Sequence, residues 1–208
     1  MRALALILNL VASSASFYNF LRARLVKWDL LIPILCGSIP ASFVMARLVI
    51  SPQIYQGILA ACLFAVAYRM IVRTSAHTRR PFSKRYLWLL GPTLGLFLGT
   101  LAGLVGIGGG IFLGPILVLM GWTDAKEAAG CCSFLIVANS LSGSVAHWAE
   151  GRLQTLAWAW ILPLVVLAAG SVGGYFGAKK LKPLFLERVF GAVVLVAGGK
   201  RARALAQG

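Results

Sequence analysis

The chain has 208 residues, of which 60% are hydrophobic and 12% are charged, and its mean hydropathy is +0.87. Because a soluble domain of this length cannot bury so much apolar surface, the composition excludes a water-soluble protein and indicates an integral membrane protein. The net charge of +15 is interpreted as basic residues held beside a lipid bilayer. Binding to nucleic acid is not expected, since it would need a solvated basic face.

Seven apolar segments, taken in chain order, predict a polytopic bundle of α-helices. About 20 apolar residues cross a bilayer, and these segments are apolar all round instead of alternating as barrel strands do. We therefore predict an all-α fold with a single transmembrane domain over residues 1–208. The segments cover residues 3–21, 28–50, 53–72, 87–121, 131–149 and 156–178, with a shorter one at 186–199.

An internal repeat relates the first segments to later ones at an offset of 130 positions. Weak internal symmetry of this kind is typical of transporters, in which the binding site lies between the two halves. The repeat predicts a partial first copy over residues 1–72 and a second copy over residues 87–208. It also indicates that the apolar start is a helix of the protein and not a cleaved signal peptide. The aligned pairs are Asn9 with Asn139, Ser14 with Ser144, Arg22 with Arg152, Trp28 with Trp158, and Pro33 with Pro163.

The basic residues predict that the two copies run in opposite directions through the membrane. Bases follow the first segment of one copy, at residues 22–27, and the second segment of the other, at residues 179–182. Because loops rich in Lys and Arg stay in the cytoplasm, these ends share one side, together with a basic cytoplasmic loop at residues 73–86. The bases at residues 200–203 do not fit this scheme.

The segment at residues 87–121 is too long for one crossing. As a single helix it would measure about 50 Å, against a hydrocarbon core of about 30 Å. Three successive glycines, Gly108 to Gly110, and the nearby Pro115 disfavour a continuous helix. We predict a broken or re-entrant segment that folds back at these glycines. The alternative is close helix packing through glycines four residues apart, which we accept for residues 91–103 and 170–177.

A glycine turn at this depth has a chemical use. Its backbone N–H groups, together with the positive end of the helix that follows, can bind an anion without a buried cation. The run lacks the Lys-Ser or Lys-Thr of a phosphate loop and the last glycine of a dinucleotide motif. No cofactor or metal is predicted. The candidate substrate-binding residues are Gly106, Gly108, Gly109, Gly110, Asn139, Asn9 and Ser133.

The polar candidates also have structural explanations. Asn9 and Asn139 are residues that can form hydrogen bonds between helices. The hydroxyl of Ser133 can instead donate to a carbonyl of its own helix. Their relation to substrate therefore stays open at this point.

The glycine signature resembles that of the TauE/SafE sulfite exporter family. The family pattern G-x-x-G-x-G-G-G, followed after four residues by Pro, is similar to residues 103–115, and a small-residue stretch ending in Asn is similar to residues 128–139. The resemblance implies a multi-pass carrier in the bacterial inner membrane for sulfur oxyanions or organosulfonates. It also implies a second glycine loop, whose position would fall before residue 1. We therefore expect a fragment or a misplaced start, or a chain that completes itself as a homo-oligomer.

These observations predict a secondary transporter for a small anion. The missing first loop favours the alternative, which is a non-transporting membrane assembly subunit or a truncated, inactive remnant. An enzyme is not expected. The five acidic residues lie near segment ends or connections and cannot be grouped with a base and a nucleophile.

Overall fold

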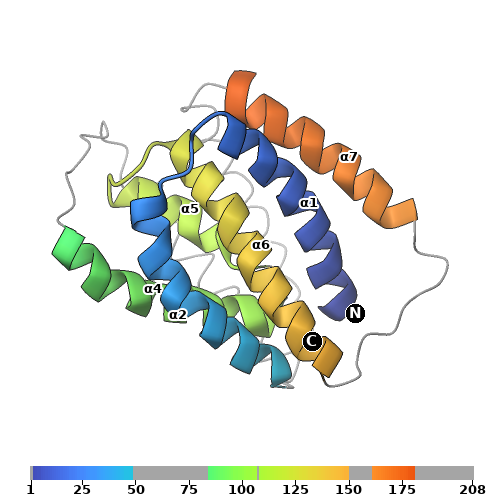
Figure 1. Ribbon diagram of the computed structural model, residues 1–208, viewed down its shortest axis with the longest axis horizontal. Coiled ribbons are helices and arrows are strands. Elements are labelled where there is room, and N and C mark those ends of the chain that lie inside the picture. Colours follow the sequence, from blue (N-terminus) through green and yellow to red (C-terminus); the bar gives the residue numbers. More distant parts are fainter. Residues whose placement is uncertain (1, 49–83, 107, 150–160, 181–208) are drawn as a thin grey trace, which may run out of the picture.

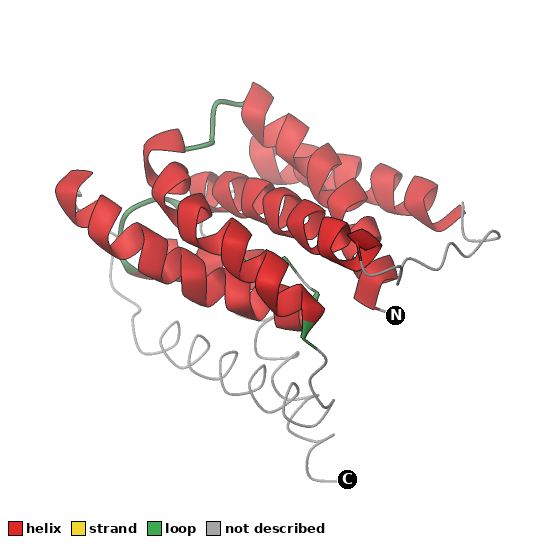
Figure 2. Ribbon diagram, turned by 60° about the horizontal axis from the view of Figure 1, so that its bottom comes forward, coloured by secondary structure: helices red, strands yellow, loops and turns green. Residues whose placement is uncertain are grey.

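The computed structural model describes residues 2–48, 84–106, 108–149 and 161–180, and every regular element in these ranges is a helix (Figures 1 and 2). This confirms the predicted all-α fold. The predicted segments at 53–72 and 186–199, and most of the basic loop, lie outside the described residues. The elements are α1 (Arg2–Arg22), α2 (Trp28–Arg47), α4 (Lys84–Val105), α5 (Gly110–Leu119), α6 (Ala125–Ala149), α7 (Ile161–Tyr175) and the π-helix η1 (Phe176–Lys180).

Four helices in the described ranges are long and apolar enough to cross a membrane. They cover Trp28–Arg47, Tyr86–Leu104, Ala125–Ala149 and Leu162–Lys180. Helix α1 has 21 residues but is less apolar than these four, because asparagines and serines interrupt its aliphatic residues. Helix α5 has only ten residues and is about 15 Å long, half the thickness of a hydrocarbon core.

The order of contacts gives the directions of the helices. Along α1, Leu6 lies against Gly143 and Phe20 against Gly130, so α1 and α6 run antiparallel. In the same way, α1 is parallel to α7, and α2 is parallel to both α4 and α6 (Figure 1). The 130-residue offset relates α1 to α6 and α2 to α7. Both related pairs are antiparallel, which is the arrangement that an inverted repeat predicts.

Glycines allow α4 to approach α2 until their backbones touch. An added Cβ on Gly95 or Gly99 would collide with the backbone of Ile34 or Ser38. We call the row Gly91, Gly95, Gly99 and Gly103 the glycine ridge of α4. The predicted packing role of this row is confirmed, as it is for Gly170 and Gly174 of α7 against α1. Gly173 differs, since nothing lies within 4 Å of its Cβ position.

Helices α4 and α5 form the predicted hairpin. Helix α4 ends at Val105 and α5 begins at Gly110, and α5 returns along α6 toward the end from which α4 started. Pro115 lies inside α5 and not at the break, so glycine rather than proline interrupts the helix. At its far end α5 closes with a left-handed Gly121 (φ 71°) and a Trp122 N–H to Leu117 C=O bond, a Schellman arrangement.

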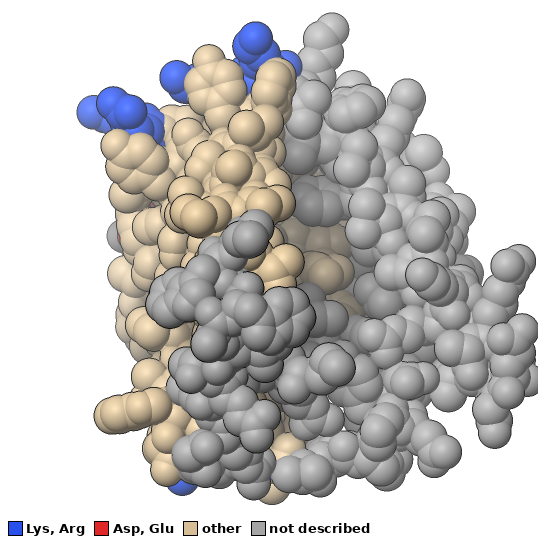
Figure 3. All heavy atoms as spheres, turned by 90° about the vertical axis from the view of Figure 1, so that its right-hand side faces the viewer, with Lys and Arg blue, Asp and Glu red and all other residues tan. Residues whose placement is uncertain are grey.

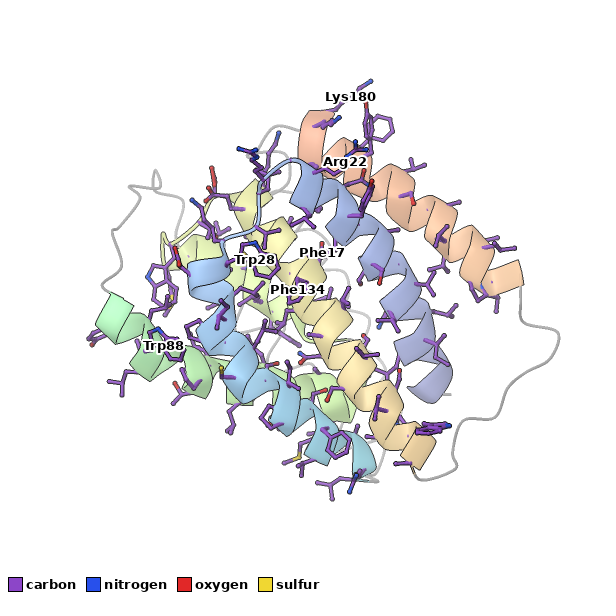
Figure 4. All side chains as sticks on the ribbon, viewed as in Figure 1. Phe17, Arg22, Trp28, Trp88, Phe134 and Lys180 are labelled. Atoms are coloured by element: carbon purple, nitrogen blue, oxygen red, sulfur yellow. The ribbon has the colours of Figure 1, made fainter. Side chains whose placement is uncertain are left out.

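The core lies between α2, α4, α5 and α6, and α5 contributes to it on nearly all its faces. Its buried members include leucines from all four helices. In addition to this core, an aromatic cluster joins α1, α2 and α6. Phe17, Trp28 and Phe134 point toward one another there, with ring centroids 4.8 to 6.3 Å apart (Figure 4). These contacts join the C-terminal half of α1 and the start of α2 to α6.

Basic side chains gather at one end of the molecule. On the face shown in Figure 3, Lys and Arg crowd the upper end and are sparse at the lower end. Arg22 and Lys180 lie together at that upper end (Figure 4). There Lys27, in the loop after α1, pairs with Glu127 at the start of α6, with 3.1 Å between Nζ and Oε1. The ends of α1 and α7 and the start of α6 thus meet on one side.

Candidate functional site

The hairpin turn places unwound backbone inside the bundle. We define the glycine loop as Gly106, Gly108 and Gly109 together with Gly110, the first residue of α5. All four are buried. The first three have φ between 73° and 76°, a left-handed conformation that costs other residues roughly 1–2 kcal/mol. The predicted break in the helix at these glycines is therefore confirmed.

Two asparagines from different helices hold the carbonyls of the glycine loop. Asn9 of α1 donates its Nδ2 to the Gly106 carbonyl at 3.1 Å, and Asn139 of α6 donates to the Gly108 carbonyl at 3.3 Å. The two asparagines are equivalent in the 130-residue repeat. Asn139 is fully buried, so its amide supplies a partner that water cannot supply at this depth.

Helix α2 orients the Asn139 side chain. Ser38 donates its hydroxyl to Asn139 Oδ1 at 2.8 Å, and Ser42 donates to the Asn139 carbonyl at 3.2 Å. Because Ser38 occupies the oxygen, the amide nitrogen of Asn139 must face Gly108. Both serines are buried, at 0% and 1% exposed. The sequence analysis did not include these two serines of the candidate site, although two hydroxyls four residues apart on an apolar helix are a signal that could have found them.

The geometry of the peptide bond determines where the loop N–H groups point. The Gly108 C=O and the Gly109 N–H belong to one planar trans peptide and face opposite ways. Asn139 therefore turns the Gly109 N–H away from itself. Among the described residues, no acceptor receives the N–H groups of Gly108, Gly109 or Gly110. Buried donors at the start of a helix that have no acceptor among these residues are suited to an anion.

Ser133 does not point to the glycine loop. Its hydroxyl donates to the Ala129 carbonyl of its own helix at 2.8 Å. The structure thus brings the four glycines and the two asparagines together, while Ser133 lies six residues before Asn139 on α6. Direct contact of Asn9, Asn139 or Ser133 with substrate remains a prediction.

A model of one protein family matches nearly the whole chain. The family is described as "Sulfite exporter TauE/SafE", and the match covers residues 1–201. The chain belongs to the TauE/SafE family. Its members are membrane transporters and not enzymes, so the predicted membrane location and transport class are confirmed at this level.

Curated relatives carry the same assignment. The chain is 27% identical to the probable membrane transporter protein y4hK of Sinorhizobium fredii, over 94% of this chain and 80% of that protein. It is 27% identical to the probable membrane transporter protein YunE of Bacillus subtilis, over 64% of this chain and 48% of YunE. Sulfite exporter TauE/SafE family protein 1 of Arabidopsis thaliana is 34% identical over 41% of this chain and 18% of its own length. No solved structure matches this chain.

Proposed function

We propose that this chain is a secondary transporter that moves a small anion, a sulfur oxyanion or an organosulfonate, across the bacterial inner membrane. One observation carries the proposal: the buried glycine loop keeps three N–H groups without acceptors among the described residues while two asparagines hold its carbonyls. The family assignment supports transport, and the printed names of the family and of one relative, sulfite exporters, suggest the substrate class.

The chemistry of the site suits an anion that must also leave. Backbone N–H groups and the positive end of α5 attract negative charge, and no lysine or arginine is among the described neighbours nearest to the Cβ positions of Gly108, Gly109 and Gly110. A site built on dipoles binds an oxyanion less tightly than a buried cation would, and this favours release. The two inverted halves would expose the loop to one side and then to the other.

The orientation follows from the charge distribution. The end that carries Arg22, Lys27 and Lys180 would face the cytoplasm, because short basic loops are retained there. Helix α4 would then enter from the cytoplasm, and α5 would return to it, with the glycine loop inside the membrane.

Transport by purified protein in proteoliposomes tests the proposal. Uptake of labelled sulfite and methanesulfonate is compared with that of a chloride control, for native protein and for Gly109→Ala. A Cβ at position 109 would lie 2.9 Å from the Leu98 carbonyl, and φ is +73° there. We expect the loop to shift and uptake to fall about tenfold, as a strain of 1–2 kcal/mol implies.

The matched control is Gly121→Ala, at the opposite end of α5. Gly121 has nearly the same backbone conformation, with φ of 71°, but it closes the helix far from the glycine loop. The control should lose a similar amount of stability and keep its uptake. Equal uptake by native protein and Gly109→Ala would refute a role for the loop in substrate binding. An absence of uptake of any tested anion by the native protein would favour a non-transporting subunit.

A further inference from the structure

Beyond the glycine loop, α6 carries a polar face toward its C-terminal end. Ser140, Ser144 and His147 are spaced by four and three residues, so they lie on one side of the helix within an arc of about 60°. Ser140 is 0% exposed and His147 is 6% exposed. The face starts directly after Asn139, which holds the loop.

The hydroxyls of Ser140 and Ser144 are unusual within this molecule. Serines and threonines in membrane helices commonly donate to the carbonyl four residues earlier, and such bonds occur here at 2.6 to 2.8 Å. The residues that make them are Ser14, Thr100, Ser133 and Ser171. Among the described residues, the buried hydroxyl oxygens of Ser140 and Ser144 have no hydrogen-bond partner at all. An unsatisfied buried hydroxyl costs roughly 1–3 kcal/mol, so this arrangement calls for a ligand.

The position of the pair connects it to the loop. Ile136, one turn before Ser140, contacts the Cβ positions of Gly108 and Gly110. Gly143, next to Ser144, faces α1, since a Cβ built on it would lie 3.1 Å from Leu6. The two serines therefore lie beside the glycine loop, near the interface of the antiparallel helices α1 and α6, in the direction of the end opposite the basic side chains.

We propose that Ser140 and Ser144 form a second anion-binding station, on the route between the glycine loop and the end of α6. This inference rests on the proposed transport function and adds the path of the substrate. Two hydroxyls one helical turn apart can each donate a hydrogen bond to one oxyanion. Because no helix N-terminus adds its positive end to these hydroxyls, they hold the anion more weakly than the loop does and can pass it on.

Paired alanine variants test the station by transport. The double variant Ser140→Ala/Ser144→Ala removes both hydroxyls, and Ser14→Ala/Ser171→Ala removes two hydroxyls that bond to their own helices. At methanesulfonate concentrations below saturation, we expect about tenfold slower uptake for the first pair, as the loss of a hydrogen bond to a charged group implies, and native uptake for the second. Binding of methanesulfonate to the detergent-solubilised protein should change less than about twofold for either pair, because the loop is intact.

The outcomes separate this inference from the transport proposal. If Gly109→Ala lowers uptake about tenfold while Ser140→Ala/Ser144→Ala transports like native protein, the station is wrong and the loop site stands. Ser140→Thr retains a hydroxyl and should retain uptake; a loss equal to that of alanine would indicate packing and overturn the station. Each variant is first checked for a single symmetric peak in size-exclusion chromatography.

Chemical labelling tests the station without any measurement of transport. A route for anions predicts that Ser140→Cys and Ser144→Cys react with a negatively charged methanethiosulfonate reagent. The rate is measured above the background of the native cysteines. We expect reaction at least about tenfold faster than for Ser171→Cys on α7, and slower reaction with methanesulfonate present. Equal rates for all three variants would overturn the station even if the native protein transported nothing.

Discussion

Helix α4 uses the same residue type for two opposite purposes along its length. In the glycine ridge, glycines stay helical and let the backbone of α2 come into contact. Three residues after the ridge ends at Gly103, Gly106 turns to φ 73° and the helix stops. The difference lies in spacing: glycines every four residues keep one face in contact with a neighbour, whereas adjacent glycines have no side chains to hold the helical turn.

The comparison also shows what each region needs from the rest of the protein. The ridge needs only the backbone of α2. The glycine loop needs amide side chains from α1 and α6, because the carbonyls of Gly106 and Gly108 accept from Asn9 and Asn139 instead of from a helical backbone N–H. The glycine ridge thus depends on the absence of side chains, and the glycine loop depends on hydrogen bonds from other helices.

The largest effect is expected from filling the ridge. In Gly99→Leu, the Cβ alone would collide with the Ser38 backbone, and Ser38 also orients Asn139. Overpacking against backbone should cost more than about 3 kcal/mol, and we expect little folded protein. Yield and melting temperature in detergent are the measurements. A variant that folds normally would contradict backbone contact between α2 and α4.

A smaller effect is expected from removing the amide that holds the loop. Asn139→Ala leaves the Ser38 hydroxyl and the Gly108 carbonyl without their partners. The expected cost is roughly 2–4 kcal/mol, with uptake reduced at least as much as in Gly109→Ala. Denaturant titration and uptake are measured on the same preparation. Normal uptake by a stable variant would show that Asn139 does not determine the loop conformation.

Asn19 provides a control for Asn139→Ala, because its side chain connects two helices and does not contact the glycine loop. Its Nδ2 donates to carbonyls of Ala15 and of Ser171 across the α1–α7 contact, away from the glycine loop. For Asn19→Ala we expect a loss of about 1 kcal/mol in stability and no change in substrate affinity. An uptake defect as large as that of Asn139→Ala would contradict the conclusion that Asn139 supports the loop whereas Asn19 only joins two helices.

The smallest effect is expected at the open glycine of α7. A Cβ added at Gly173, as in Gly173→Leu, has no neighbour within 4 Å among the described residues, in contrast to one added at Gly99. Its melting temperature and uptake should equal those of native protein, with a stability change within about 0.5 kcal/mol. A strong destabilisation would mean that another surface covers Gly173.

Sequence reasoning located the hairpin because its determinants are local. A segment of 35 apolar residues is too long for one crossing, and three consecutive glycines identify the turn. The packing of Gly91 to Gly103 was predictable for the same reason, since a four-residue spacing needs no knowledge of the neighbour. The break was wrongly attributed in part to Pro115, which α5 accommodates within its own helix.

The partners of the loop could be predicted only in part. The repeat identified Asn9 and Asn139 as a pair, but no sequence pattern says whether an amide points to a substrate or to a carbonyl. That direction depends on Ser38 and Ser42, which come from α2 and meet Asn139 about a hundred residues apart in the chain. Ser133 was a candidate because it is polar, and its bond to Ala129 depends on a rotamer that the sequence leaves open.

The two asparagine contacts of the glycine loop bear on how the protein is made. During synthesis from the N-terminus, Asn9 exists before the hairpin, whereas Asn139 is added 31 residues after Gly108. Until α6 enters the membrane, the Gly108 carbonyl lacks the partner that a lipid environment cannot provide. The hydrogen bonds of the turn are therefore completed only when α6 has been synthesised and packs against α4 and α5.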